Sequence, residues 1–299
     1  GTLTLSASNT YDGSTNVNAG TLAVSGSLSD STAVNVASGA TYSLLASDTV
    51  GSLEGAGNVS LGANRLTAGD SNDKTFSGVI SGSGGFTKVG TGTQTFTGTN
   101  TYTGSTIINA GTLSVGSGGN TGSISNSGGV TNNGSIKFNR SNSYTFSGDI
   151  TGSGSLVKAG SGTVTLSGSN TYSGGTTINA GTIKVSDLSA IGTGSIAISD
   201  ELDLSNQIKK SSLSYTLNGS GRITNPKAES NPQQDKNTPE GKANNTQNTV
   251  NNTASNSGNK SNTPSSGSGS GSSPASPPSL VKPSGGGKSE AKENSKSES

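Results

Sequence analysis

The amino-acid sequence predicts an all-β fold, a parallel β-helix (β-solenoid) over residues 1–225, followed by a disordered tail at 226–299. Three observations predict it. Apolar residues alternate with polar ones over short runs, turn-forming residues separate these runs, and a long segment is repeated along the chain. The two parts differ in kind, because all aromatic residues lie before position 216 and all eight prolines lie at or after 226.

The alternating runs predict strands. A period of two places the apolar side chains of a run on one face, as in a β-strand. The runs are bounded by Gly, Asn, Ser and Asp, which accept tight turns and positive φ. Glycine, at 47 of 299 residues, is too frequent for stable helices. Examples of alternating pairs are Leu3/Leu5, Val34/Val36, Val59/Leu61, Ile136/Phe138, Val164/Leu166 and Ile183/Val185.

Internal repetition indicates how the strands are arranged. Residues 76–115 and 146–185 are identical at 24 of 40 positions, and residues 1–24 match the second half of the same unit. The signature Asn-Ala-Gly-Thr begins at Asn18, Asn109 and Asn179, so successive copies begin 91 and then 70 positions apart. A chain wound in coils of roughly 20–25 residues fits three coils into the shorter interval and four into the longer one. Equivalent residues such as Ile108 and Ile178 are then expected in vertical register.

Parallel coils are favoured over hairpins because most turns are long Gly/Ser stretches rather than two-residue Asn-Gly or Asp-Gly turns. At about 4.8 Å per coil, residues 1–225 predict on the order of ten coils and a rod roughly 45–50 Å long. A stacked solenoid also accommodates one additional coil easily, since each coil contacts only its neighbours.

Composition limits the classes of function. The net charge is +1, divided as −1 over residues 1–225 and +2 over the tail, so no concentrated positive field is present and nucleic acid is not an expected partner. Absence of Cys and His rules out disulfides, thiolate metal sites and a Ser-His nucleophile. No run approaches the roughly 20 apolar residues that span a bilayer. The tail predicts a flexible spacer, with a ligand-binding or wall-associating segment as the alternative.

No catalytic constellation is predicted, and the expectation is a protein that is not an enzyme and needs no cofactor or metal. Gly69-Asp70-Ser71 has the order of a serine-protease nucleophile turn but is interpreted as a polar loop. Asp200, Glu201 and Asp203 form the tightest acidic group, and with Leu202 and Leu204 facing inward, Glu201 and Asp203 are expected on a solvated outer face. A carbohydrate-active β-helix enzyme using such carboxylates is the less favoured alternative.

The repeated motifs supply the candidate positions. We interpret the Tyr of Asn-Thr-Tyr as packing over coil edges, with a glycan- or protein-binding face as the alternative. We expect the Asn of Asn-Ala-Gly to bond turn backbone groups, in a stacked amide ladder, and the Gly to form the turn. The positions are Tyr11, Tyr102, Tyr172, Asn18, Asn109, Asn179, Gly20, Gly111 and Gly181.

The phrases Gly-Thr-Leu-Thr-Leu-Ser, Ser-Asn-Thr-Tyr and Asn-Ala-Gly-Thr-Leu within residues 1–22, together with the two 40-residue units, resemble the β-strand repeat of bacterial autotransporter passengers. The likeness extends over roughly residues 1–200, and Gln94 departs from it by replacing the apolar residue found at Leu3 and Val164. The resemblance implies a right-handed β-helix, export by the type V route, and a location outside a Gram-negative cell, either secreted or at the outer-membrane surface.

The function that this resemblance implies is structural: a rod that supports export and displays adhesive regions. The alternative is an adhesin or a self-associating biofilm element. The partners then expected are a host-surface protein or glycan, a second copy of the chain, and a C-terminal translocator barrel of the full-length protein, which residues 1–299 do not include.

Overall fold

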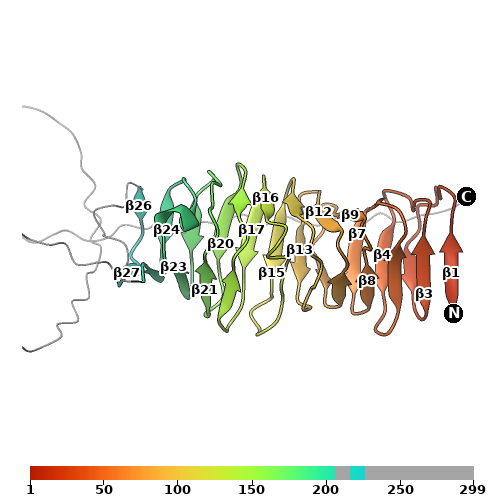
Figure 1. The fold of residues 1–299 in the computed structure, drawn as a ribbon, viewed down its shortest axis with the longest axis horizontal. Helices are drawn as coiled ribbons and strands as arrows, with labels where there is room; N and C mark the ends of the chain where they lie inside the picture. The colour runs from red at the N-terminus through yellow and green to blue at the C-terminus, as the bar shows by residue number, and fades with distance from the viewer. Residues whose placement is uncertain (206–215, 226–299) are drawn as a thin grey trace, which may run out of the picture. The chain divides into compact units, whose positions relative to one another are not determined.

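The computed structural model describes residues 1–205 and 216–225. Two compact units divide the chain, Gly1–Thr253 and Ala254–Ser299, and all described residues belong to the first. The predicted disordered tail at 226–299 lies outside the described residues. Within them, every strand pairs in parallel with a strand one coil away, and no α-helix is present. The predicted parallel β-solenoid is confirmed, and Figure 1 shows its coils stacked along one axis.

Twenty-seven strands form four sheets in the described residues. The eleven-stranded sheet contains β2 (Thr15–Val17), β4 (Ala33–Val36), β7 (Ser52–Gly55), β10 (Lys74–Phe76), β13 (Thr93–Phe96), β15 (Thr112–Val115), β17 (Ser135–Phe138), β20 (Ser155–Lys158), β22 (Thr176–Ile178), β24 (Ile196–Ile198) and β26 (Leu217–Asn218). The six-stranded sheet contains β6 (Asp48–Val50), β9 (Arg65–Ala68), β12 (Gly85–Lys88), β14 (Thr106–Ile108), β16 (Val130–Asn132) and β19 (Ile150–Thr151).

Two five-stranded sheets complete the coils. The first contains β1 (Thr2–Leu5), β3 (Thr21–Val24), β5 (Thr41–Leu44), β8 (Asn58–Ser60) and β11 (Val79–Ser81). The second contains β18 (Tyr144–Phe146), β21 (Thr163–Leu166), β23 (Thr182–Val185), β25 (Glu201–Asp203) and β27 (Arg222–Thr224). A full coil therefore passes through three strands, as β8, β9 and β10 do early in the chain and β18, β19 and β20 do later. One 3₁₀ turn, η1 (Leu188–Ile191), replaces a strand.

The coil length lies at the lower end of the predicted range. Register partners in the eleven-stranded sheet lead from Thr15 to Leu217 in ten steps, which average about 20 positions each. If the three strand positions of a coil are counted as its three faces, the shorter interval between motif copies is three coils and one further face. The longer interval is four coils and two further faces. The prediction that the two intervals are whole numbers of coils, three and four, is therefore wrong by one face and by two faces. Accordingly, Ile108 lies in the six-stranded sheet and Ile178 in the eleven-stranded one, out of vertical register.

The interior is filled by the inward-facing residue of each pleat. In the eleven-stranded sheet, Phe76, Phe96, Val115 and Phe138 follow one another in register and are fully buried. Phe96 also packs edge-to-face against Phe86, with ring centroids 4.9 Å apart. A buried Phe contributes roughly 1.5–3 kcal/mol, so each coil is stabilised mainly by the apolar layer that it shares with its neighbours.

One coil is longer than the rest. Val130 stands 24 positions after its register partner Thr106, and the additional length forms a corner between β15 and β16. This corner is held by Arg140, whose guanidinium donates to the carbonyl oxygens of Gly122 and, at 2.5 Å, Asn120. Arg140 also lies over the Tyr144 ring, 4.8 Å from its centroid. The insertion is therefore ordered by contacts with the following coil.

Candidate functional site

The Asn of each Asn-Thr-Tyr motif joins neighbouring coils through its side chain. Asn170 Oδ1 accepts from the Ile150 N–H at 2.7 Å, and its Nδ2 donates to the Ala190 carbonyl at 2.6 Å. These partners lie 20 residues before and 20 residues after Asn170, in the preceding and following coils. Because the amide both accepts and donates, it replaces backbone ladder bonds where the chain turns a corner.

Asn100 makes the same bridge in the second copy of the motif. Its Oδ1 accepts from the Ile80 N–H at 2.8 Å, and its Nδ2 donates to the Ser123 carbonyl, also at 2.8 Å. In the first copy, Asn9 Nδ2 donates to the carbonyl oxygens of Ala7 and Ser27. The sequence did not identify these asparagines as the bridging ones, because the same role was expected of the Asn in Asn-Ala-Gly.

The Tyr of the same motif is anchored by the threonine four residues later. The hydroxyl pairs Tyr11–Thr15, Tyr102–Thr106 and Tyr172–Thr176 are each 2.6 Å apart. Tyr102 and Tyr172 are buried, at 2% and 0% exposure, so their rings are not available to a glycan or a protein partner. Tyr11, in the first coil, is 40% exposed. Burial supports the expected packing role for the second and third copies.

The Gly of Asn-Ala-Gly is required by its backbone. Gly20, Gly111 and Gly181 have φ of 70°, 66° and 70°, a region that disfavours side chains. A Cβ on any of them would lie 2.4 Å from a carbonyl oxygen of the neighbouring coil, that of Gly1, Gly92 or Gly162 respectively.

The Asn of Asn-Ala-Gly does not have the expected role. Asn18, Asn109 and Asn179 are exposed, and within the described part of the chain their side-chain amides make no hydrogen bond, although the backbone N–H groups of Asn109 and Asn179 donate to the carbonyls of Lys88 and Lys158. Because the second and third copies lie on different faces of the solenoid, Asn109 also cannot stack on Asn179. The stacked amide ladder expected here is therefore wrong, and the bridging amides belong to the Asn-Thr-Tyr motif instead.

Two buried lysines mark the corners that these glycines form. Lys88 is 1% exposed, and its Nζ donates to the carbonyl oxygens of Val89 at 2.5 Å and Gly90 at 2.9 Å. Lys158, fully buried, donates to the carbonyls of Gly160 and, at 3.0 Å, Ala180. The two lysines occupy equivalent positions of the 40-residue unit. Each ammonium therefore supplies hydrogen-bond donors to the backbone carbonyls of its corner.

Burial sets the protonation behaviour of these lysines. Desolvation lowers the pKa of Lys158 to about 8, and the Asp200 carboxylate opposes the shift. The pKa of Lys88 is also lowered by burial, against the attraction of Asp70 and Asp73. Asp70, whose loop has the order of a nucleophile turn, therefore lies near a buried cation together with Asp73.

Gln94, the residue that departs from the repeat pattern, points into the core of the eleven-stranded sheet. It is 1% exposed, and its Nε2 donates to the Leu53 carbonyl at 3.1 Å.

A second buried polar pair lies nearer the N-terminus, where the Tyr42 hydroxyl donates to Asp48 Oδ2 at 2.5 Å. Burial is the main cause that raises the pKa of both groups. Asp48 also accepts from the Leu28 N–H, so it links two coils as Asn100 and Asn170 do.

The acidic group near β25 is paired rather than free. Glu201 Oε2 lies 2.8 Å from Arg222 Nη2, and Asp203 Oδ2 lies 3.5 Å from Lys184 Nζ. Leu202 is fully buried beneath them, as expected. The carboxylates therefore lie on the outer side of β25 as predicted, but the expected solvated face is wrong, because Asp203 is only 9% exposed and both groups join successive coils through ion pairs. No cluster of three or more His, Cys, Asp or Glu that could hold a metal occurs among the described residues, and none of those residues forms a helix long and apolar enough to cross a membrane.

These polar side chains are used to connect coils. Three segments of the chain, residues 1–24, 86–115 and 156–185, match the model of the passenger-associated-transport-repeat. No curated protein and no solved structure gives a significant match. The matched segments contain the bridging Asn, the anchored Tyr and the turn Gly described above. Repeats of this family imply a secreted or surface-associated protein. The chain thus carries three segments that match the passenger-associated-transport-repeat, a repeat of autotransporter passengers.

Proposed function

We propose that this chain is a structural rod of an autotransporter passenger, which supports export and displays other regions at the outer-membrane surface. The observation that carries the proposal is the use of its buried polar groups. Asn100, Asn170, Lys88 and Lys158 all connect one coil to the next, as expected for residues whose role is to keep a long stack in register.

The eleven-stranded sheet adds a second line of support. It runs without interruption from β2 to β26, so load or folding can pass from coil to coil along one face. Where strand pairing is interrupted on the other faces, side chains connect the coils. Asn100, for example, connects the segments that contain Ile80 and Ser123. Coil-by-coil stacking therefore continues where strand pairing does not.

The export role is tested by placing the chain between a signal peptide and a translocator barrel in a Gram-negative host. An epitope inserted between Gly118 and Gly119, which lie on the exposed corner of the long coil, reports surface display through antibody labelling of intact cells. The test variant is Asn100→Ala with Asn170→Ala, and the matched control is Asn109→Ala with Asn179→Ala.

The parent and the control are expected to label equally, whereas the bridging variant should label several-fold less for the same amount of total protein. Equal labelling of the two double variants would contradict a role of coil stacking in export. Absence of labelling from the parent, with the barrel inserted, would contradict the display role.

A second candidate, self-association, is favoured by the first coil. Its open side forms a groove of about 250 Å³ that includes Leu3, which is 61% exposed, and Tyr11. The equivalent tyrosines Tyr102 and Tyr172 are covered by neighbouring coils. When residues 1–299 are produced as a separate chain, strands with an unpaired edge and an apolar groove favour strand addition by a second copy.

Sedimentation velocity over a concentration series tests this second candidate. Assembly is expected to weaken in Leu3→Glu and to persist in Leu45→Glu, which changes an equally exposed leucine away from the groove. A parent that stays monomeric at the highest concentration would exclude it.

A further inference from the structure

On the outer surface of the six-stranded sheet, equivalent positions are covered by an arginine at one place and form an open groove at another. Arg65, Gly85, Ser105, Gly129 and Asp149 follow one another in register along this sheet, one per coil. Glycine at two of the five positions removes side chains that would otherwise cover the backbone. The column therefore contains two places where a planar group could lie against main-chain carbonyls.

Arg65 fills the first place. Its guanidinium lies across Gly85, where Nη1 donates to the Phe86 carbonyl, the Thr87 hydroxyl and the Ser105 carbonyl, each at 3.2 Å. Nη2 donates to Ser105 Oγ at 2.7 Å. A Cβ on Gly85 would lie 2.6 Å from Nη2, so glycine is what admits the guanidinium.

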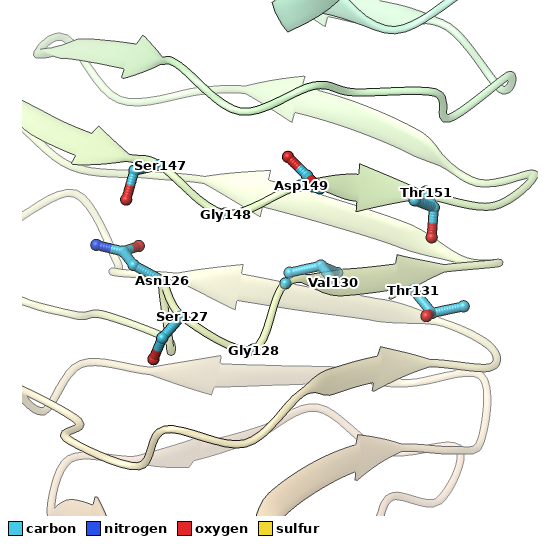
Figure 2. A pocket seen from close by; sticks show the side chains of 10 residues that line it. Asn126, Ser127, Gly128, Val130, Thr131, Ser147, Gly148, Asp149 and Thr151 are labelled. Carbon is cyan, nitrogen blue, oxygen red and sulfur yellow. The ribbon is translucent and has the colours of Figure 1, made fainter.

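The second place lies two coils further along and has the same plan. Gly129 takes the position of Gly85, Thr131 that of Thr87, and Asp149 that of Ser105. A groove of about 330 Å³ occurs here. Figure 2 shows its two sides, with Ser147, Gly148 and Asp149 on one and Asn126, Ser127 and Gly128 on the other.

Two differences decide what the open groove can bind. Ser105 now stands where Arg65 stands in the filled place, and its short side chain cannot reach across Gly129. Asp149 replaces a serine and so adds a carboxylate at the rim. One of its oxygens, Oδ1, accepts from the Ser169 N–H at 2.7 Å. Within the described residues, the other oxygen takes part in no hydrogen bond or ion pair.

From this register equivalence we propose that the Gly129–Asp149 groove binds the arginine side chain of a partner protein. A guanidinium is planar and has five donors, which suits a site that offers a carboxylate, a threonine hydroxyl and backbone carbonyls. The filled place shows this chain holding that same group with neutral acceptors alone. This site goes beyond the proposed rod function and does not depend on it.

Binding of N-acetyl-arginine amide to the full chain, followed by backbone amide chemical shifts in NMR, tests the proposal. A single side chain is expected to bind with a Kd on the order of millimolar, with shift changes confined to residues 126–131 and 147–151. The uncharged isostere N-acetyl-citrulline amide and the lysine derivative should each bind at least several-fold more weakly.

Asp149→Asn is the site variant, because an Asn Oδ1 can still accept from the Ser169 N–H. It should weaken arginine binding about ten-fold while leaving the thermal unfolding midpoint within experimental error. Arg65→Ala is the positive control, since it opens the groove at Gly85 and should create a second set of arginine-dependent shifts there. Equal binding of arginine, lysine and citrulline, shifts elsewhere, or an Asp149→Asn variant that binds arginine as the parent does would each overturn the proposal.

Discussion

Replacing Asn170 by alanine removes both hydrogen bonds that its amide makes across the solenoid. The Ile150 N–H and the Ala190 carbonyl then lose their partners, at donor–acceptor distances that are 2.7 and 2.6 Å in the structure. The side chain of Asn170 is 3% exposed, so water does not readily take its place. An unsatisfied buried donor or acceptor costs about 1–3 kcal/mol, so the two groups together give a loss of roughly 2–6 kcal/mol for Asn170→Ala.

Urea unfolding followed by far-UV circular dichroism measures this loss, and hydrogen exchange of the Ile150 amide locates it. Asn179→Ala is the matched control, because Asn179 is exposed and should change the free energy of unfolding by less than about 0.5 kcal/mol. If Asn170→Ala and Asn179→Ala unfold at the same urea concentration, or if Ile150 exchanges at the same rate in both, the bridging interpretation fails.

Three further changes test the buried groups. The folded pKa of Lys158 is about 8 and the unfolded value is the ordinary 10.5, so between these pH values the unfolded chain binds more protons than the folded chain. The free energy of unfolding should therefore rise by about 1.5 kcal/mol from pH 8 to 9.5. Lys158→Met should remove that rise in urea titrations across this range. Gly181→Ala should cost more than about 2 kcal/mol, since its strained φ combines with a Cβ 2.4 Å from a carbonyl oxygen. Gly39→Ala should cost only about 1 kcal/mol, because Gly39 has φ of 82° but an added Cβ would have no atom within 4 Å. Equal unfolding midpoints of the two variants would show that close approach is unimportant. Tyr102→Phe should lose about 1 kcal/mol with its buried hydroxyl bond, whereas Tyr11→Phe should be nearly neutral when both are measured by urea unfolding.

Strand positions were predictable because alternation is a local property. Val34 and Val36, and likewise Val164 and Leu166, lie inward on β4 and β21 as the pattern indicated. The coil count between motif copies was not predictable to the same accuracy. The shorter interval fits three long coils as well as three shorter coils and one further face, and the spacing of motifs alone does not distinguish these solutions.

The bridging residues were harder to identify. The two asparagines of the repeat, which are Asn100 and Asn109 in the second copy, have equivalents in every copy, and both lie beside turns. Repetition therefore did not show which side-chain amide points inward. That choice depends on which way the corner folds over the preceding coil. The identity of Lys88 and Lys158 at equivalent positions was a usable signal, because an unpaired lysine kept among apolar neighbours indicates a buried contact.

The displacement of the second copy onto another face also explains what the repeat specifies. The repeated unit spans about two coils, yet β14 of the second copy lies in the six-stranded sheet and β22 of the third in the eleven-stranded sheet. The same strand–corner–strand sequence is thus compatible with different faces, because its bridging Asn needs only an N–H in the coil before and a carbonyl in the coil after. Copies one and three are eight coils apart, since eight successive pairings lead from β2 to β22 within one sheet. The spacing between copies can therefore change by a single face or by whole coils without disturbing any bridge, because each bridge involves only the two adjacent coils.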